Sequence, residues 1–145
     1  MPIQHLGHVV LKVRNLARAE RFYHDVLGLP IATRSSALGM IFFTLGDHHD
    51  FAIMQIGDDA PPADPAAPGL FHVAFNIGNT IDELRSMKAR LEALGVTLDR
   101  IEDHTVSQSL YLNDPDGNGI ELYVDTSDSW KYDRSLVATV KPLAI

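Results

Sequence analysis

Three side chains of this sequence have the types and the spacing of a divalent-metal site. His8 and His72 lie 64 positions apart, each at the start of an alternating apolar run, and Glu121 stands between Ile120 and Leu122. Two neutral imidazoles and one carboxylate bind Fe(II), Mn(II), Zn(II) or Ni(II) and leave coordination positions open for a chelating substrate. The chemistry to expect is that of a metal-dependent site with room for a small molecule.

The strands expected around these residues place all three side chains on the face opposite the apolar one. Residues 8–13, 71–77 and 119–124 alternate as half-buried strands do. If each sheet curls around a cleft, His8, His72 and Glu121 point into it from different strands. The apolar faces of the three runs consist of Val9, Leu11 and Val13, of Phe71, Val73, Phe75 and Ile77, and of Ile120, Leu122 and Val124.

The order of the expected elements is repeated along the chain. Asn15 caps a helix that ends at Gly28, and Thr80 with Glu83 forms a capping box for a helix that ends near Gly95. Each half then has one strand, one helix and three further strands, which predicts an α+β fold. The further strands are expected at about residues 31–35, 40–45 and 51–56, and at about 96–102, 108–113 and 119–124.

One domain over residues 1–145 is predicted to contain both modules. The first module covers about residues 3–57 and the second about residues 70–125, separated by a proline-rich connector at 58–69. A C-terminal arm, residues 126–145, follows the second module and contains the single tryptophan, Trp130.

Composition narrows the classes of partner. The chain has no cysteine, so thiolate ligands and cysteine nucleophiles are excluded and a metal must be held by nitrogen and oxygen. A net charge of −7 disfavours a nucleic-acid partner. No apolar run approaches the roughly 20 residues of a membrane helix, and the start lacks a secretory signal. We expect a soluble, cytoplasmic protein that acts on a small molecule, and the apolar side chains of the C-terminal arm favour a homodimer.

Taken together, these motifs resemble those of the vicinal oxygen chelate superfamily. The marks are His8, the run Phe22-Tyr23 with Val26-Leu27-Gly28-Leu29, His72, and Asp114-Pro115-Asp116-Gly117-Asn118 ahead of Glu121. The resemblance covers essentially the whole chain and implies two paired βαβββ modules in a curved, barrel-like mixed sheet with the helices outside. It also implies that His8, His72 and Glu121 are the metal ligands, with Fe(II) the expected ion.

The fourth metal position separates classes within this superfamily. Members similar to glyoxalase I use a glutamate from the last strand of the first module. In this sequence Phe51 or Ile53 falls there, depending on the gap, and neither can bind a metal. Asp50 and Gln55 lie nearby and replace them if the register differs. The expected site therefore has three protein ligands, as in extradiol dioxygenases.

The region before Glu121 resembles that of catechol 2,3-dioxygenase-like members. In these members a tyrosine ten residues before the glutamate and a nearby histidine meet the substrate, which implies catalytic roles for Tyr111 and His104. Extradiol enzymes also have an acid–base histidine in a region where this chain has only its connector. His48 or His49 then has to supply that group, although the simplest interpretation of both is an exposed turn.

The leading functional hypothesis is an extradiol-type ring-cleaving dioxygenase acting on a catechol-like aromatic diol. Phe42, Phe51, Asn76 and Tyr123 are the expected substrate contacts. The first alternative is a lyase or isomerase of the glyoxalase or epimerase type, with Asp50 as the base. The second is a binder of small toxic molecules without catalysis, similar to bleomycin-resistance proteins. The segment from Asp114 to Asn118 is interpreted as a tight turn without chemistry.

Overall fold

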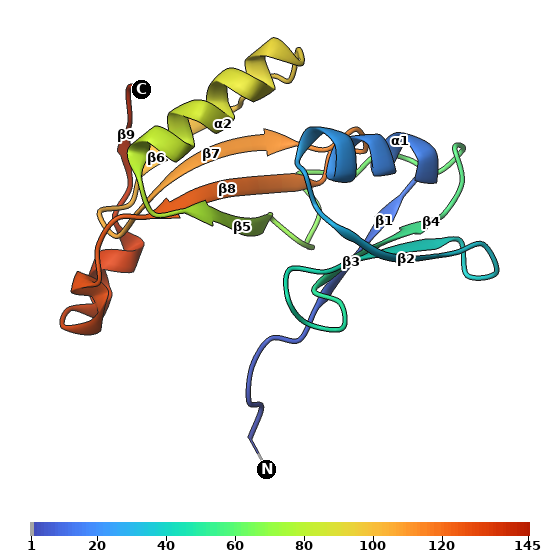
Figure 1. The fold of residues 1–145 in the computed structure, drawn as a ribbon, viewed down its shortest axis with the longest axis horizontal. Helices are drawn as coiled ribbons and strands as arrows, with labels where there is room; N and C mark the ends of the chain where they lie inside the picture. Colours follow the sequence, from blue (N-terminus) through green and yellow to red (C-terminus); the bar gives the residue numbers. More distant parts are fainter. Residues whose placement is uncertain (1) are drawn as a thin grey trace. The chain divides into compact units, whose positions relative to one another are not determined.

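The computed structural model describes residues 2–145 and divides them into two compact units. Unit 1 comprises residues 2–66 together with Asp114–Gly117, and unit 2 comprises Ala67–Asn113 together with Asn118–Ile145. Each unit contains one sheet and one main helix, so the predicted α+β class with βαβββ modules is confirmed (Figure 1).

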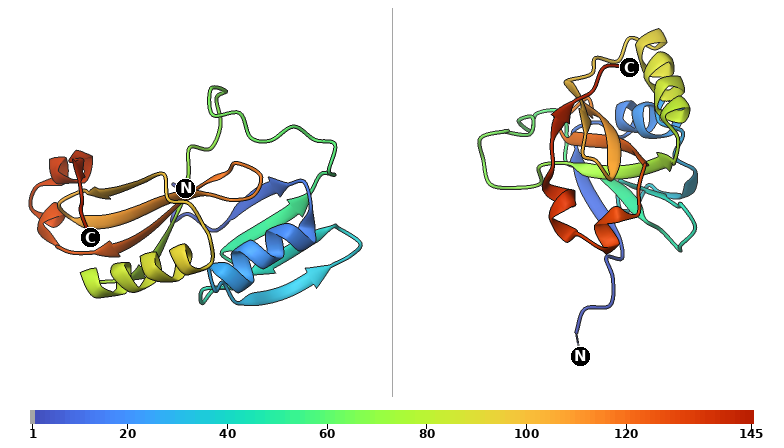
Figure 2. Two further views of the ribbon diagram at one scale, coloured as in Figure 1. Left: turned by 90° about the horizontal axis from the view of Figure 1, so that it is seen from above. Right: turned by 90° about the vertical axis from the view of Figure 1, so that its left-hand side faces the viewer.

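Unit 1 contains a four-stranded sheet in the order β1-β4-β3-β2. β1 and β4 pair in parallel, and the other pairs are antiparallel (Figure 2). The buried side chains include Leu11, Tyr23, Phe43, Phe51 and Ile53. The elements are β1 (Val9–Val13), α1 (Leu16–Glu20), η1 (Arg21–Val26), β2 (Ile31–Ser35), β3 (Met40–Phe43) and β4 (Phe51–Gln55).

The first helix begins as predicted but changes its winding halfway. The Asn15 side chain accepts a hydrogen bond from the Arg18 amide at 3.0 Å, which caps α1. From Arg21 the backbone is π-helical, and the Leu27 amide donates to the Phe22 carbonyl at 2.9 Å. Gly28 ends the segment at a φ of +85°, a left-handed conformation that glycine adopts without strain.

Unit 2 contains a five-stranded sheet in the order β5-β8-β7-β6-β9. β5 and β8 pair in parallel, and β7 and β8 form an antiparallel hairpin. The C-terminal arm folds back, and its last strand pairs with β6, which the sequence did not predict. The elements are β5 (Val73–Gly78), α2 (Ile81–Ala93), β6 (Arg100–Asp103), β7 (Ser107–Asn113), β8 (Gly119–Asp125), η2 (Ser129–Lys131), η3 (Arg134–Ala138) and β9 (Lys141–Pro142).

Helix α2 lies across one face of the unit 2 sheet (Figure 1). The predicted capping box is confirmed, since the Glu83 amide donates to Thr80 Oγ1 and the Glu83 carboxylate accepts from the Thr80 amide at 2.9 Å. Leu84 and Leu91 are the buried side chains of this helix. The helix therefore covers the apolar face of the strands and leaves the opposite face to the polar side chains.

The turn Asp114–Gly117 is held within unit 1 by buried hydrogen bonds. The hydroxyl of Tyr23 donates to Asp114 Oδ2 at 2.7 Å. Asp116 accepts from the Arg14 amide at 3.1 Å and pairs with the guanidinium groups of Arg14 and Arg18 at 2.7 and 3.0 Å. These contacts fit the expectation that this turn is structural.

Between β4 and β5 the described chain has neither helix nor strand, as the prolines of the connector predict. Among residues 2–145, the longest helices are too short or too polar to cross a membrane.

Candidate metal and active site

Strand register gathers the predicted catalytic side chains of unit 2 on one face of its sheet. Glu121 of β8 lies beside Ala74 of β5 on one side and Tyr111 of β7 on the other, and Tyr111 pairs in turn with Arg100 of β6. Paired residues on adjacent strands project from the same face. The row therefore faces away from α2, as the alternation of the sequence predicts.

Within this row, His72 and Glu121 are close enough to share a metal ion. His72 Nε2 lies 2.9 Å from Glu121 Oε2, and two donors at right angles around an ion with bonds of about 2.1 Å lie about 3 Å apart. Glu121 is 8% exposed, and its Oε1 accepts a 2.6 Å hydrogen bond from Ser109 Oγ. The donor types and their separation therefore fit a divalent cation.

The other ring nitrogen of His72 lacks a partner in the described part of the chain. Nδ1 is buried and has no hydrogen-bond partner among residues 2–145. Buried polar atoms are normally paired, so Nδ1, which is not the nitrogen that faces Glu121, has room for a hydrogen bond to a further bound group.

His104 and Tyr111 are joined directly by a hydrogen bond. The Tyr111 hydroxyl and His104 Nε2 are 2.8 Å apart, and His104 Nδ1 lies 2.8 Å from the carbonyl oxygen of Thr139. Since a carbonyl oxygen only accepts, Nδ1 carries the hydrogen, and in the neutral ring Nε2 accepts the proton of Tyr111. The C-terminal arm thus fixes the tautomer of His104.

The phenol of Tyr111 is held in its neutral form. Burial is the main cause that raises the pKa of Tyr111 to about 12, followed by the nearby negative charge of Glu121. The Arg100 guanidinium stacks over the Tyr111 ring, with 3.8 Å between its central carbon and the ring centroid. The hydroxyl is therefore available near neutral pH both to donate and to accept a hydrogen bond.

His8, the third predicted metal ligand, belongs to unit 1. It immediately precedes β1, is exposed, and contacts His49 with 4.1 Å between ring centroids and 40° between the ring planes. The structure brings His72 and Glu121 together within unit 2, and the three-ligand set with His8 stays a prediction.

The repeat can be aligned by strand pairing, which corrects the predicted fourth position. Val9 pairs with Phe51 in unit 1 as Val73 pairs with Ile120 in unit 2. Ala52 therefore occupies the place of Glu121, and the expectation of Phe51 or Ile53 there was wrong by one residue. The last strand of the first module still supplies no fourth ligand at this position, because the alanine side chain has no metal-binding atom.

Asp50 and Gln55, the other candidates for a fourth ligand, take part in local structure. The Asp50 carboxylate accepts hydrogen bonds from the amides of Leu45 at 2.6 Å and Asp47 at 3.3 Å. Gln55 Oε1 accepts from the Leu16 amide at 2.9 Å. These bonds close the turn before β4 and tie β4 to the start of α1.

The four predicted substrate contacts have different surroundings. Phe51 is 1% exposed and packs against Tyr23 with 4.8 Å between ring centroids, so it is a core residue. Phe42 meets His49 edge-on at 5.4 Å. Asn76 donates to Asp125 at 2.9 Å, and Tyr123, its partner in the sheet register, is half-buried. Asn76 and Tyr123 are therefore on the face that carries Glu121.

Three further residues contribute to this site and were not predicted from the sequence: Ser109, Arg100 and Thr139. Ser109 lies two residues before Tyr111, so strand alternation places both side chains on the same face. Arg100 is found only through the pairing of β6 with β7. No local signal identifies Thr139, because its contact spans 35 residues and depends on the arm folding back.

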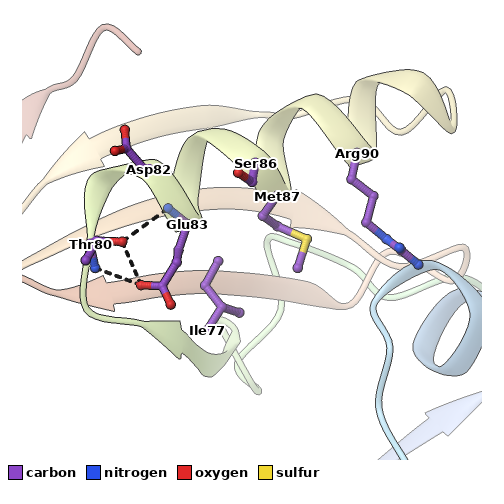
Figure 3. A pocket seen from close by; sticks show the side chains of 7 residues that line it. All are labelled: Ile77, Thr80, Asp82, Glu83, Ser86, Met87 and Arg90. Atoms are coloured by element: carbon purple, nitrogen blue, oxygen red, sulfur yellow. Dashed lines mark hydrogen bonds between the residues drawn. The ribbon is translucent and has the colours of Figure 1, made fainter.

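A pocket beside α2 contains none of the predicted site residues. Figure 3 shows the Glu83 carboxylate turned back to Thr80 within it, so this charge is used by the helix cap. The pocket is lined by Ile77, Thr80, Asp82, Glu83, Ser86, Met87 and Arg90.

A family model confirms the class that the fold and the site define. The model described as Glyoxalase/Bleomycin resistance protein/Dioxygenase superfamily matches residues 5–122. The chain belongs to this family.

Particular relatives include two proteins named as dioxygenases. The chain is 33% identical over 132 residues to catechol-2,3-dioxygenase of Bacillus subtilis (strain 168), covering 90% of this chain and 45% of that protein. It is 35% identical over 122 residues to biphenyl-2,3-diol 1,2-dioxygenase 3 of Rhodococcus globerulus, covering 83% and 63%. The chain thus spans about half to three fifths of the length of these relatives.

A solved structure supports the fold. The glyoxalase/dioxygenase from Nostoc punctiforme aligns with a TM-score of 0.73 over 86% of this chain and 92% of that chain. The two sequences are 20% identical, so this likeness shows the fold alone.

Proposed function

We propose that the chain is an extradiol-type dioxygenase that cleaves the ring of a catechol-like aromatic diol. The observation that carries the proposal is the hydrogen-bonded pair of Tyr111 and His104 beside His72 and Glu121 on one sheet face. The relatives named as dioxygenases of catechol and of biphenyl-2,3-diol support the same substrate class.

His8, His72 and Glu121 are the proposed ligands of Fe(II). When bound, Fe(II) supplies open positions for the two vicinal oxygens of the diol and for O2, and it exchanges electrons between them. Mn(II), Zn(II) and Ni(II) suit the same donor atoms, so the preference for iron depends on the proposed reaction with oxygen.

Tyr111 and His104 are proposed to move one proton from the diol. Tyr111 Oη takes the proton of a diol hydroxyl as it passes its own proton to His104 Nε2. The Glu102 carboxylate, 3.7 Å from that nitrogen, favours the resulting imidazolium. Thr139 holds the Nδ1 hydrogen throughout, so the ring keeps the orientation in which Nε2 faces Tyr111.

Asn76 and Tyr123 are proposed to contact the substrate, because both lie on the face that carries Glu121. Phe42 is retained as an aromatic contact of unit 1. Phe51 is not carried forward, since its side chain is enclosed by the core.

We further propose a homodimer. The support is the set of large apolar side chains that stay exposed in the described chain, among them Ile3, Leu6, Phe71 and Val140. Sedimentation equilibrium at micromolar concentration is expected to give twice the mass of the chain, and a single-chain mass contradicts this part of the proposal.

Anaerobic purification, reconstitution with Fe(II) and a panel of catechols test the reaction. Oxygen uptake with a ring-opened product is expected, and His8→Ala and His72→Ala are expected to abolish it. His5→Ala serves as the matched control, since His5 is an exposed histidine outside every proposed set. Stoichiometric metal binding without oxygen uptake across the panel contradicts the dioxygenase.

A further inference from the structure

A second group of metal-binding side chains lies wholly within unit 1. His8, His48 and His49 each offer a ring nitrogen, and these three atoms lie within 4.8 Å of one another. The rings of His8 and His49 are 4.1 Å apart between centroids, and those of His48 and His49 are 4.6 Å apart. We call these three residues the histidine cluster.

Strand pairing explains why residues 40 positions apart meet here. β1 and β4 are parallel neighbours, and the Val9 amide donates to the Asp50 carbonyl at 3.2 Å. The residue before β1 is therefore held beside the residues before β4. Because this contact is part of the sheet, His8 and His49 stay close without any bound ion.

Local hydrogen bonds close the turn that carries the other two histidines. Thr44 Oγ1 donates to the Asp47 carbonyl at 2.6 Å, and the Asp50 carboxylate accepts from the Leu45 amide at 2.6 Å. The Asp50 amide donates to the Phe43 carbonyl at 3.0 Å. The turn is therefore shaped by its own backbone and presents its imidazoles toward β1.

Aromatic packing orients the central imidazole of the histidine cluster. The edge of one ring meets the face of the other where His49 contacts Phe42, at an interplanar angle of 89° and a centroid distance of 5.4 Å. His49 is half-buried, whereas His8 and His48 are exposed. An ion can therefore reach all three rings from solvent, while Phe42 limits the rotation of the ring between them.

We propose that the histidine cluster is a binding site for Zn(II), Ni(II) or Cu(II). Three imidazole nitrogens favour these ions over Fe(II) and Mn(II), which rank lower in affinity for nitrogen donors. Three protein ligands also leave a coordination position for water or another small ligand. The site differs from the proposed iron centre in having no carboxylate among its ligands.

His8 belongs both to the histidine cluster and to the proposed iron ligands, so the two sites compete for it if the proposed function holds. An ion held by the histidine cluster engages the imidazole that the iron centre requires. Zn(II) or Ni(II) bound there then competes with iron loading, and the competition is lost when His48 and His49 are replaced.

Calorimetric titration of the full chain with Zn(II) tests the site in a background without the other ligands. In His72→Ala with Glu121→Gln, we expect about one equivalent of Zn(II) to remain bound. Adding His48→Ala and His49→Ala to this background is expected to weaken binding at least about 100-fold, because two of three ligands are removed. His5→Ala in the same background is the matched control and is expected to leave the affinity unchanged.

Cu(II) provides a second readout through the nitrogen hyperfine structure of its electron paramagnetic resonance spectrum. Coordination by several imidazoles is expected in the background variant and is expected to be lost with His48 and His49. If the background variant binds no Zn(II), or if binding survives replacement of both turn histidines, the proposal is wrong. If the background variant that combines His72→Ala with Glu121→Gln fails to fold, Glu121→Gln alone serves as the background. Since this background lacks Glu121, a negative result leaves the oxygen-uptake test of the dioxygenase untouched.

Discussion

Tyr111 carries the hydroxyl on which the proposed proton transfer depends. Tyr111→Phe removes the hydrogen bond to His104 but keeps the ring that Arg100 stacks on. We expect kcat to fall by about 100-fold or more, the usual contribution of a proton-transfer group, with little change in folding. Steady-state oxygen uptake and circular dichroism measure the two effects.

Tyr132→Phe is the matched control for this change, because Tyr132 is almost fully exposed in the C-terminal arm. Its kcat is expected to equal that of the wild type. An unchanged kcat in Tyr111→Phe contradicts the assigned role.

The raised pKa of Tyr111 also predicts how stability depends on pH. The folded-state pKa is about 12 and the ordinary pKa of tyrosine is 10.0, so between these values the unfolded chain loses this proton and the folded chain keeps it. The free energy of unfolding is therefore expected to fall as pH rises from about 10 to 12. Urea denaturation at several pH values measures the decline, which is expected to be shallower in Tyr111→Phe.

Tyr23 adds to the alkaline effect in the same direction, since burial and the Asp114 carboxylate raise its pKa well above the usual value. The comparison of Tyr111→Phe with Tyr23→Phe separates the two contributions. A decline that is identical in the wild type and both variants contradicts the assignment.

Asp116 is expected to matter for stability and not for catalysis. Its carboxylate is 4% exposed and is shared by the partly exposed Arg14 and Arg18, and losing hydrogen bonds to a charged group costs about 2 kcal/mol. Asp116→Ala is therefore expected to lower the free energy of unfolding by about that amount in urea denaturation. Asp82→Ala, which removes an exposed pair with Arg85, is the control and is expected to cost less than about 1 kcal/mol.

At the scale of elements, the C-terminal arm acts on the site through His104. A chain that ends at Ala138 loses the Thr139 carbonyl that holds the Nδ1 hydrogen. We expect its His104 to populate both neutral tautomers, whereas the full chain populates the Nδ1–H form. Long-range proton–nitrogen correlation spectra of the imidazole distinguish the two cases.

A chain that ends at Leu143 is the control for this truncation. It keeps Thr139, the pairing of β9 with β6, and the bond from the Leu143 amide to the Ile101 carbonyl. A fixed Nδ1–H tautomer in the shorter chain contradicts the positioning role of the arm.

Elements set by local signals could be predicted from the sequence. The caps at Asn15 and Thr80 and the left-handed glycines at Gly28 and Gly95 define both helices within one residue or two. The π-helical turn after Glu20 could not be predicted, because the apolar spacing of Phe22 and Tyr23 suits either winding. Strand β9 has two residues, too few for an alternating pattern.

The candidate site was predictable only where alternation assigned a face. The alternation of β8 assigned Glu121 to the face opposite the apolar one, and the family resemblance identified Tyr111, which pairs with Glu121 in the sheet. The register between paired strands could not be predicted from the sequence, so Phe51 or Ile53 was expected where Ala52 lies at the position equivalent to that of Glu121. The meeting of His8 with His49 also depends on parallel pairing, which joins segments far apart in the chain.

At the scale of the whole molecule, metal binding should be visible as added stability. An ion that binds only the folded chain adds about 2.7 kcal/mol at a hundredfold excess over its dissociation constant. We expect Mn(II), an air-stable substitute for Fe(II), to raise the melting temperature of the wild type but not of Glu121→Ala.

Asp125→Asn is the control, since it alters a carboxylate of the same strand outside the proposed ligand set. Chelation followed by dialysis is expected to reverse the increase in the wild type. An equal increase in Glu121→Ala shows that the ion binds elsewhere.

The alignment of Ala52 with Glu121 suggests how the two halves of the chain diverged. The first half therefore has a methyl group at the position where the second half has a carboxylate. Ala52 is paired with Val10 on the face that carries His8, and Ala52→Glu would restore the carboxylate in the register of its counterpart. Because Ala52 is fully buried, a carboxylate introduced there would require a partner such as a bound cation.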